Sequence, residues 1–300
     1  MPERQQDWLR YFDADTVARL AHIGINPSGL VEGNLIGNHR SPFHGFAVEF
    51  AGHRGYVPGD DIKHIDWKVY YKSERYMVKT YEQETNFLCH MVVDISESMT
   101  FEHEHGRKLD YAAFIATAIS YVVVNQSDSV GAIFFDDDIR STVRVSNQED
   151  VVSRISREMI AADPKQSTSL GDVLSLVAEQ IGRRRVVFVV SDFFGDLEHT
   201  FDGIKRLLDD NHEIILLQVV DPLELSFDIP GRVRLLELEG ERKLDLVGRD
   251  IQASYEACFH EFLDAFKARA MSLGIDYILC DMSRAFGFHL AEYLSLRTMR

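Results

Sequence analysis

The stretch that decides the fold is LCHMVVDISESM, residues 88–99. Residues 88–93 form a mainly apolar run, which is typical of a strand buried on both faces of a sheet. The run ends in Asp94-x-Ser96-x-Ser98, and the segment that follows at residues 108–125 is apolar nearly all round, as expected for a helix packed into a large core. A buried strand, a polar loop and a helix in this order predict an open α/β sheet with a ligand site at its carboxyl edge.

Short apolar runs alternate with longer helical segments from residue 87 onward, which predicts an open, mostly parallel sheet with helices on both faces. The strands are expected at residues 88–93, 130–135, 186–191, 214–219 and 277–280. The helices are expected at residues 108–125, 148–160, 170–181, 197–209 and 251–273. Residues 140–145 are expected to form an edge strand in a hairpin, and residues 232–248 an inserted β-hairpin.

Residues 1–86 lack the alternation of apolar runs and helical segments that the rest of the chain shows. A short helix is expected at residues 15–23, and extended segments at 46–50 and 76–81, the second of which runs into the first buried strand without a linker. We therefore expect residues 1–86 to be a β-containing N-terminal extension packed on a main domain of residues 87–300. Trp67 is expected to be largely buried in that packing, since its indole would otherwise expose a large apolar surface.

The charge balance excludes some classes of partner. The 300 residues carry 32 Lys and Arg against 48 Asp and Glu, a formal net charge of −16, which argues against general affinity for nucleic acid or an anionic membrane. Residues 87–300 hold 22 basic and 36 acidic side chains, so 14 of the 16 excess negative charges lie there and favour a basic partner or a cation. The three cysteines are widely spaced, and the sequence shows neither a signal peptide nor an apolar run long enough for a membrane span. We expect a soluble, cytoplasmic protein.

Oxygen-bearing side chains end two of the predicted buried strands. Asp94, Ser96 and Ser98 follow the strand at 88–93, Asp192 follows the strand at 186–191, and Thr168 precedes the helix that begins at residue 170. Together they form a ligand set for a hard divalent cation, magnesium or manganese, with too little charge for tight calcium binding and no nitrogen or sulfur for zinc. The alternative is that Asp94, Ser96 and Ser98 only cap the turn after the strand.

Three further polar clusters could carry chemistry. Asp60, Asp61 and Asp66 lie within seven residues, either as a second metal or catalytic site or as turn and helix caps; we favour the caps, because no base, nucleophile or phosphate loop stands beside them. Residues 136–138 are three aspartates that we interpret as a charged turn in preference to a general base. The third cluster, His103-x-His105, has metal-like spacing but no evident third ligand, which disfavours zinc.

The predicted cation ligands also carry a resemblance. Asp94-x-Ser96-x-Ser98, with Thr168 and Asp192, resembles the metal-ion-dependent adhesion site of von Willebrand factor A domains. Residues 40–300 resemble a narrower prokaryotic family, domain of unknown function 58. The stretches that carry this second resemblance are Phe50, Arg54-Gly55-Tyr56-x-Pro58-Gly59-Asp60-Asp61-Ile62-x-x-Ile65-Asp66-Trp67, Val78-Lys79-x-Tyr81-x-x-Glu84, Ser191-Asp192-Phe193-Phe194 and Leu290-x-x-Tyr293-Leu294-x-x-Arg297. Ser169 stands where the resemblance leads us to expect Asp.

The resemblance implies a fold, a site and a partner. The fold would be the von Willebrand factor A-like, Rossmann-type sheet. Ser96, Ser98 and Thr168 would coordinate magnesium directly and Asp94 and Asp192 mainly through water, which leaves a position open for a carboxylate of a partner protein. Proteins of this family are typically encoded beside MoxR-type AAA+ ATPases. The chain would then be a non-catalytic interaction module that acts with such an ATPase, or on a client protein, in chaperone-like assembly or maturation.

The alternative function is a metal-dependent hydrolase, with a phosphatase of the haloacid dehalogenase type as its best version. That chemistry calls for Asp-x-Asp at the end of the first strand, so that the first Asp can be the nucleophile, and here the second position is Ser96. The chain also lacks the phosphate-loop pattern Gly-x-x-x-x-Gly-Lys-Ser/Thr, so it is not expected to be the ATPase itself.

Overall fold

The computed structural model describes residues 7–25, 27, 36–41, 49–58, 60–163, 169–229, 231–236 and 243–298. The chain divides into two compact units, a larger one of residues 1–31 and 88–300 and a smaller one of residues 32–87. Residues 1–31 belong to the larger unit because helix α1 (Ala14–Ile23) packs on α3 (Lys108–Asn125) and α9 (Phe286–Thr298). The packing of the rest of the N-terminal extension on the main domain stays a prediction.

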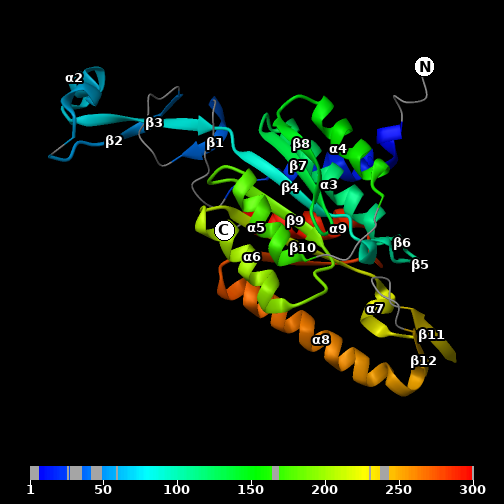
Figure 1. The fold of residues 1–300 in the computed structure, drawn as a ribbon. Coiled ribbons are helices and arrows are strands. Elements are labelled where there is room, and N and C mark those ends of the chain that lie inside the picture. Colours follow the sequence, from blue (N-terminus) through cyan, green and yellow to red (C-terminus); the bar gives the residue numbers. More distant parts are fainter. Residues whose placement is uncertain are drawn as a thin grey trace. The chain divides into compact units, whose positions relative to one another are not determined.

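A six-stranded sheet lies at the centre of the larger unit (Figure 1). Its strands, in spatial order, are β13 (Asp276–Asp281), β10 (Glu213–Val220), β9 (Val186–Ser191), β4 (Leu88–Asp94), β7 (Ser129–Phe135) and β8 (Ile139–Ser146). Neighbouring strands are parallel except β8, which pairs antiparallel with β7 at the edge. The predicted α/β class, the mostly parallel sheet and the edge strand are therefore confirmed. The strand that ends in Asp94 is central, with Val93 opposite both Val190 and Phe134.

Helices cover both faces of this sheet (Figure 1). On one face lie α5 (Leu170–Gln180), α6 (Leu197–Asp209) and α8 (Gly248–Ser272). The core between these helices and the strands includes Val92, Val189, Leu216, Phe201 and Phe266. On the other face α3 packs against α1, α9 and α4 (Asp150–Ala161). Burial on several sides explains why α3 is apolar nearly all round, as the sequence indicated.

Shorter elements complete the larger unit. The predicted inserted hairpin is confirmed as β11 (Arg232–Leu236) paired antiparallel with β12 (Lys243–Val247). The sequence reasoning did not anticipate the helical turns η2 (Asp7–Tyr11), η4 (Glu97–Thr100) and α7 (Pro222–Ser226), the small hairpin of β5 (Glu102–His103) and β6 (Gly106–Arg107), or helix α9. None of the helices in the described ranges combines the length and the apolar character needed to cross a membrane.

Helices α5 and α6 approach closely through two glycines. A methyl group on Gly171 would lie 2.2 Å from the carbonyl oxygen of His199, and one on Gly203 would lie 2.4 Å from the carbonyl oxygen of Gly171. Both contacts are with backbone atoms, which cannot rotate away as a side chain could. The two helices can therefore keep this distance only while glycine occupies both positions.

We predict that Gly171→Ala lowers the free energy of unfolding by about 1–3 kcal/mol, the usual cost of overpacking a closed interface. Urea denaturation followed by circular dichroism measures the change. Glu179→Ala, an exposed site on the same helix, is the control and should cost about 0.5 kcal/mol or less. A Gly171→Ala variant as stable as the wild type would contradict the close helix contact.

The smaller unit is a three-stranded antiparallel sheet with a helical crossover. Its strands lie in the order β1 (Ile36–Ser41), β3 (Met77–Thr85) and β2 (Glu49–Gly55), and η3 (Ile62–His64) and α2 (Trp67–Ser73) connect β2 to β3. The expected extended segment at residues 76–81 is thus part of β3. Residues 46–48 of the other expected segment lie outside the described residues.

The carboxylates of the Pro58–Asp66 segment all have local structural roles. Arg54 donates two hydrogen bonds to Asp60, at 2.6 and 2.7 Å, and Asp61 caps η3 by accepting from the amide of Lys63. Asp66 caps α2 and also accepts from His53 at 2.9 Å. These contacts agree with the favoured interpretation of the segment as turns and caps.

The expected burial of Trp67 is wrong. Trp67 is the first residue of α2 and is 48% exposed. Its indole meets the ring of Tyr70 edge-on, with 6.1 Å between the ring centroids. The helix is held by the Asp66 cap and by backbone hydrogen bonds, so its position does not depend on the indole. The apolar surface of Trp67 is left facing solvent.

The contacts of Asp66 predict how the stability of the smaller unit depends on pH. The hydrogen bond from His53, with those from the amides of Val69 and Lys68 and the charge of Lys79, lowers the pKa of Asp66 to about 2. A carboxyl with a lowered pKa stabilises the folded state above its unfolded pKa of about 4, and this contribution is lost as the pH falls toward 2.

We therefore predict that Asp66→Asn destabilises the smaller unit above pH 5 and that the difference from the wild type shrinks toward pH 2. Urea titrations read by Trp67 fluorescence in a Trp8→Phe background measure it, since Trp8 and Trp67 are the two tryptophans of the chain. Asp228→Asn, an exposed site on the larger unit, is the control. A deficit of equal size at pH 6 and pH 2.5 would contradict the role of the Asp66 charge.

Candidate functional site

Asp94 ends the central strand β4, and its carboxylate is held from two directions. One oxygen accepts the backbone amide of Ser96 at 2.8 Å, and the other accepts the hydroxyl of Ser191 at 2.6 Å. Ser191 ends the neighbouring strand β9, and its own oxygen accepts the amide of Phe193. These contacts fix the Asp94 carboxylate between two parallel strand ends, 2% exposed.

The two serines of the loop after β4 converge. The hydroxyl oxygens of Ser96 and Ser98 lie 3.1 Å apart, the first buried and the second half-buried. The chain turns into η4 directly after Ser96, and the two hydroxyls meet at this turn. Asp94, Ser96 and Ser98 therefore form one polar group at the carboxyl edge of the sheet.

Asp192 lies at the same edge, directly after β9, and is also buried. One of its carboxylate oxygens accepts the amide of Phe194 at 3.2 Å, and its backbone carbonyl accepts the side-chain amide of Gln218 at 2.7 Å. The other carboxylate oxygen accepts the ammonium of Lys108 at 2.7 Å. The negative charge of Asp192 thus has a partner within the chain.

Lys108 is the first residue of α3, and its side chain is only 1% exposed. Besides Asp192, its ammonium donates to Glu224 of α7 at 2.8 Å and faces the rings of Phe194 and Phe101. Burial opposes a charge on this lysine, but the two carboxylates outweigh the burial and hold the pKa of Lys108 above its ordinary value. Lys108 therefore joins the start of α3 to the ends of two strands by a buried ion pair.

Asp94, unlike Lys108, is a buried ionisable group beside a charge of its own sign. Burial, with the negative charge of Asp192 as the second cause, raises the pKa of Asp94 to about 7. Its hydrogen bonds come from neutral groups, and among the described residues no Lys, Arg or His side chain forms an ion pair with it. A carboxylate in this environment gains stability from any positive charge placed beside it.

Four of the five predicted cation ligands, Asp94, Ser96, Ser98 and Asp192, lie at this carboxyl edge. The fifth, Thr168, lies outside the described residues. The donor set fits a hard divalent ion, because it consists of oxygen atoms and includes one buried carboxylate without a counter-charge. No group of three or more His, Cys, Asp or Glu side chains placed to hold a metal occurs in the described ranges.

The sequence reasoning missed Lys108, Ser191 and Glu224 as parts of this edge. Lys108 did offer a signal, because it is a charged residue at the start of a segment that is otherwise almost wholly apolar. In the sequence, Ser191 stands out only as the first residue of the motif Ser191-Asp192-Phe193-Phe194. Glu224 belongs to the short helix α7, which no sequence pattern predicted. Their contacts join residues 84 to 116 positions apart, which no local pattern encodes.

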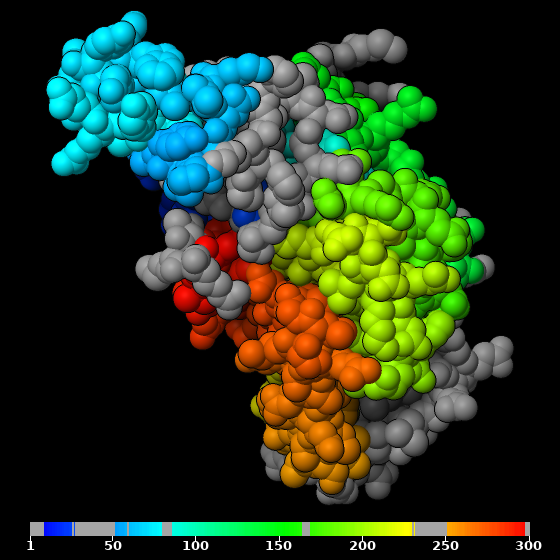
Figure 2. All heavy atoms as spheres, turned by 90° about the vertical axis from the view of Figure 1, so that its left-hand side faces the viewer, coloured from blue at the N-terminus to red at the C-terminus, as the bar shows by residue number. Residues whose placement is uncertain are grey.

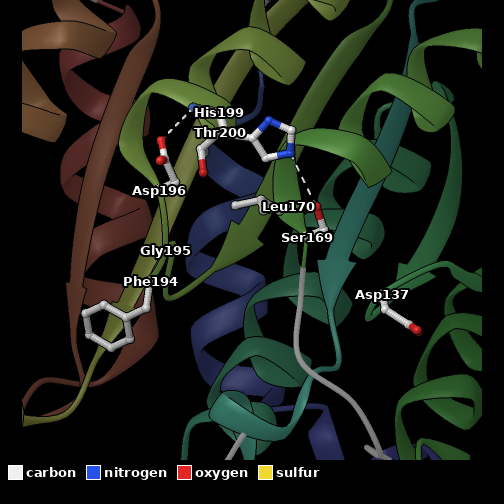
Figure 3. A pocket seen from close by; sticks show the side chains of 8 residues that line it. All are labelled: Asp137, Ser169, Leu170, Phe194, Gly195, Asp196, His199 and Thr200. Atoms are coloured by element: carbon white, nitrogen blue, oxygen red, sulfur yellow. Dashed lines mark hydrogen bonds between the residues drawn. The ribbon is translucent and has the colours of Figure 1, made fainter.

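A pocket of about 360 Å³ opens at the start of α5 and α6 (Figure 3). It is lined by Asp137, Ser169, Leu170, Phe194, Gly195, Asp196, His199 and Thr200. Ser169 and His199 approach one another in it, with 3.3 Å between the hydroxyl oxygen and Nε2 (Figure 3). Phe194 lies two residues beyond Asp192, so the pocket and the candidate cation ligands share one strand end.

Ser169 stands where the sequence resemblance leads us to expect Asp. The hydroxyl of Ser169 donates to the carboxylate of Asp172, three residues further on. A carboxylate therefore lies beside position 169, although residue 169 is itself a serine. His199 Nε2 lies 3.3 Å from Asp172 as well as 3.3 Å from Ser169. Because one imidazole nitrogen faces both groups, this cluster lacks the geometry of a catalytic triad, in which the two ring nitrogens serve different partners.

The other polar clusters have structural contacts. Arg140 binds Asp136 at 2.5 Å and also Asp137 in the turn between β7 and β8, in agreement with a charged turn. His103 in β5 has Nδ1 3.7 Å from the carboxylate of Asp221, the N-cap of α7. His105 follows in the turn of the β5–β6 hairpin and is exposed.

Residues 52–261 match the family model described as protein of unknown function DUF58. The chain belongs to this family. Relatives include uncharacterized proteins of Mycobacterium bovis and Mycobacterium tuberculosis, 24% identical over 230 residues, which cover 76% of this chain and 72% of the relatives.

Similar solved structures include the conserved hypothetical protein BatB from Bacteroides thetaiotaomicron, 15% identical with a TM-score of 0.44 over 72% of this chain and the whole of that one. The pilus adhesin SpaC from Lactobacillus rhamnosus GG is 11% identical with a TM-score of 0.43, over 70% of this chain and 30% of the adhesin.

We predict that Lys108→Met destabilises the protein by about 3–5 kcal/mol, because it leaves two carboxylates buried without their cation. Lys205→Met removes a lysine that is 40% exposed and paired with Asp202, and should cost about 1 kcal/mol or less. Urea denaturation at neutral pH compares the two variants. Equal, small losses for both would show that the Lys108 bridge does not hold this edge together.

Proposed function

We propose that this chain is a non-catalytic, divalent-cation-dependent protein-interaction module with a von Willebrand factor A-like domain. The ion would be magnesium or manganese, held by Asp94, Ser96, Ser98, Thr168 and Asp192 in the manner of a metal-ion-dependent adhesion site. When bound, it would supply an electrophilic position for a carboxylate of a partner protein. The partner would be a MoxR-type AAA+ ATPase, or a client protein matured with it, in the cytoplasm.

The observation that carries this proposal is the buried carboxylate of Asp94, which has hydroxyl and amide donors but no positive charge among the described residues. The adjacent hydroxyl oxygens of Ser96 and Ser98 support it, because a pair of neutral oxygen atoms beside one carboxylate suits magnesium better than it suits zinc. Asp94, Ser96, Ser98 and Asp192 all lie within residues 52–261, which match the family model.

The charge of the site bears on its affinity. Only two of the five proposed ligands are carboxylates, and Asp192 shares its charge with Lys108. Affinity for calcium and magnesium rises with the number of charged ligands, so binding in the micromolar range or weaker is expected. Lys108 would keep Asp192 in a fixed orientation in both the free and the loaded protein.

The hydrolase alternative has less support. Besides a metal ion, a phosphatase would need a general base beside the nucleophile. Asp136, a candidate base by residue type, is paired with Arg140, and Lys108 is 1% exposed and occupied by two carboxylates. We therefore expect that the chain does not hydrolyse phosphate esters in the presence of magnesium. An Asp94-dependent hydrolysis would support the alternative.

We predict that calorimetric titration detects magnesium and manganese binding to the wild-type chain. Asp94→Ala/Ser96→Ala should abolish the binding, and Ser98→Ala should weaken it about tenfold, because direct oxygen ligands are removed. Ser175→Ala is the matched control, since that hydroxyl only binds a carbonyl within its own helix, 2.9 Å away. A wild type that binds no divalent ion, or an unchanged double variant, would remove the proposed site.

The partner is tested by affinity capture from the native host with magnesium or with EDTA, read by mass spectrometry. A partner that depends on the site should be lost in EDTA, recovered on adding magnesium, and lost with Ser98→Ala. Ser98→Ala should leave the fold nearly intact, at a cost of about 1 kcal/mol or less. Capture that is equal in EDTA and with Ser98→Ala would contradict the mechanism, even if the ion itself binds.

A further inference from the structure

The helix α2 and the residues on either side of it expose an unusual number of large apolar side chains. Tyr71 is 84% exposed, and the set of exposed large apolar residues also includes Val57, Ile62, Trp67 and Tyr76. All five belong to the smaller unit and lie within about twenty residues of sequence. Contiguous apolar and aromatic exposure of this kind marks interaction sites in soluble proteins, whereas single exposed residues do not.

The aromatic rings of this region are ordered by contacts with one another. Tyr70 stacks on Tyr76 with 4.6 Å between ring centroids and an interplanar angle of 22°, and Trp67 meets Tyr70 edge-on. Tyr56 lies 6.4 Å from Tyr76. Rings held in this way lose little conformational freedom when a partner covers them, which is why tyrosine and tryptophan dominate binding surfaces.

Four positive charges surround these rings. Lys63, Lys68, Lys72 and Arg75 are exposed, and within the described ranges none of them forms an ion pair with a carboxylate. Other charges of the same unit are paired, as Arg54 is with Asp60 and Lys79 with Asp66. Asp61 and Glu74 are the exposed acidic residues of residues 56–76, so basic side chains outnumber exposed acidic ones by four to two.

The helical spacing places the rings and the charges side by side. Trp67 and Tyr71 are four residues apart and share one side of α2, and Lys68 and Lys72 share the adjacent side. Figure 2 draws this part of the chain in cyan. We call Lys63, Trp67, Lys68, Tyr71, Lys72, Arg75 and Tyr76 the α2 surface.

We propose that the α2 surface binds an acidic segment of a partner protein, with aromatic or aliphatic side chains of that segment lying on Trp67 and Tyr71. The charges select a partner of opposite sign, and the rings supply the apolar contact area. This surface is a different site from the proposed cation site, and it does not depend on a bound metal ion.

The charge distribution favours a protein segment over a nucleic acid or a membrane. The chain as a whole carries a net charge of −16, so an extended polyanion or an anionic bilayer would meet repulsion outside this small basic area. A short acidic segment stays within the area, where the nearby charges act over the screening distance of about 8–10 Å. Four cations are also fewer than the phosphate contacts that a duplex-binding surface commonly makes, about 6–10.

The test uses the full chain with Trp8→Phe, so that Trp67 is the only tryptophan and reports on its own surroundings. The probe is a synthetic glutamate-rich peptide that also carries leucine and phenylalanine, compared with a counterpart that has glutamine in place of each glutamate. We expect a saturable blue shift of Trp67 emission with the acidic peptide, weakened by added salt. Lys68→Glu/Lys72→Glu and Tyr71→Ala should each weaken binding about tenfold or more.

Lys205→Glu/Lys267→Glu is the matched control, because it makes the same change of net charge on the larger unit, at one lysine whose side chain is 40% exposed and at a second that is exposed. It should leave peptide binding within about twofold of the wild type. Circular dichroism and urea titration establish that each variant is folded before it is compared. The same titrations in EDTA should give the same affinity, which separates this surface from the cation site.

Three results would overturn the proposal. The first is the absence of binding of the acidic peptide by the wild type. The second is an equal loss of binding in the matched control, which would mean that net charge alone matters. The third is a larger Trp67 response to vesicles of phosphatidylserine and phosphatidylcholine, or to single-stranded polyuridylate, than to the acidic peptide, which would assign the surface to a membrane or to RNA.

Discussion

The carboxyl edge of the larger unit depends on one buried ammonium. Lys108 lies at the start of α3 and binds carboxylates that follow β9 and β10, two strands that are neighbours in the sheet. Removing three charged groups from water is costly, and only their mutual contacts offset that cost. The loop after β9, the short helix α7 and the first turn of α3 must therefore keep their arrangement for any of these charges to remain buried.

That arrangement leaves the edge with an unequal distribution of charge. Asp192 is neutralised by Lys108, whereas Asp94, on the central strand, is surrounded by hydroxyl and amide donors. The raised pKa of Asp94 is the direct consequence of its burial and of the second carboxylate nearby. This buried carboxylate without a counter-charge among the described residues is the physical basis of the proposed function.

The smaller unit has the opposite distribution of unpaired charge. Its aspartates are bound by local arginine, histidine and backbone groups, while its rings and several lysines face solvent. One chain thus combines an edge with a buried, unpaired Asp94 carboxylate and a surface on which exposed lysines are not paired with carboxylates of the described residues. Both proposals call for a partner that carries carboxylates, one to complete the coordination of an ion and several to lie along α2.

The sequence by itself determined the local structure of this protein. Apolar runs and helical periodicity predicted the five parallel strands, the edge strand and the long α3, because burial on two faces or all round leaves a continuous apolar pattern. Its motifs also led to the family and to the aspartates and serines at the carboxyl edge. Only the tertiary structure decided that Lys108 neutralises Asp192 and not Asp94, and that Trp67 faces solvent. The reason is that these outcomes depend on which distant strand ends become neighbours and on which surfaces remain uncovered, and periodicity along the chain carries no record of either.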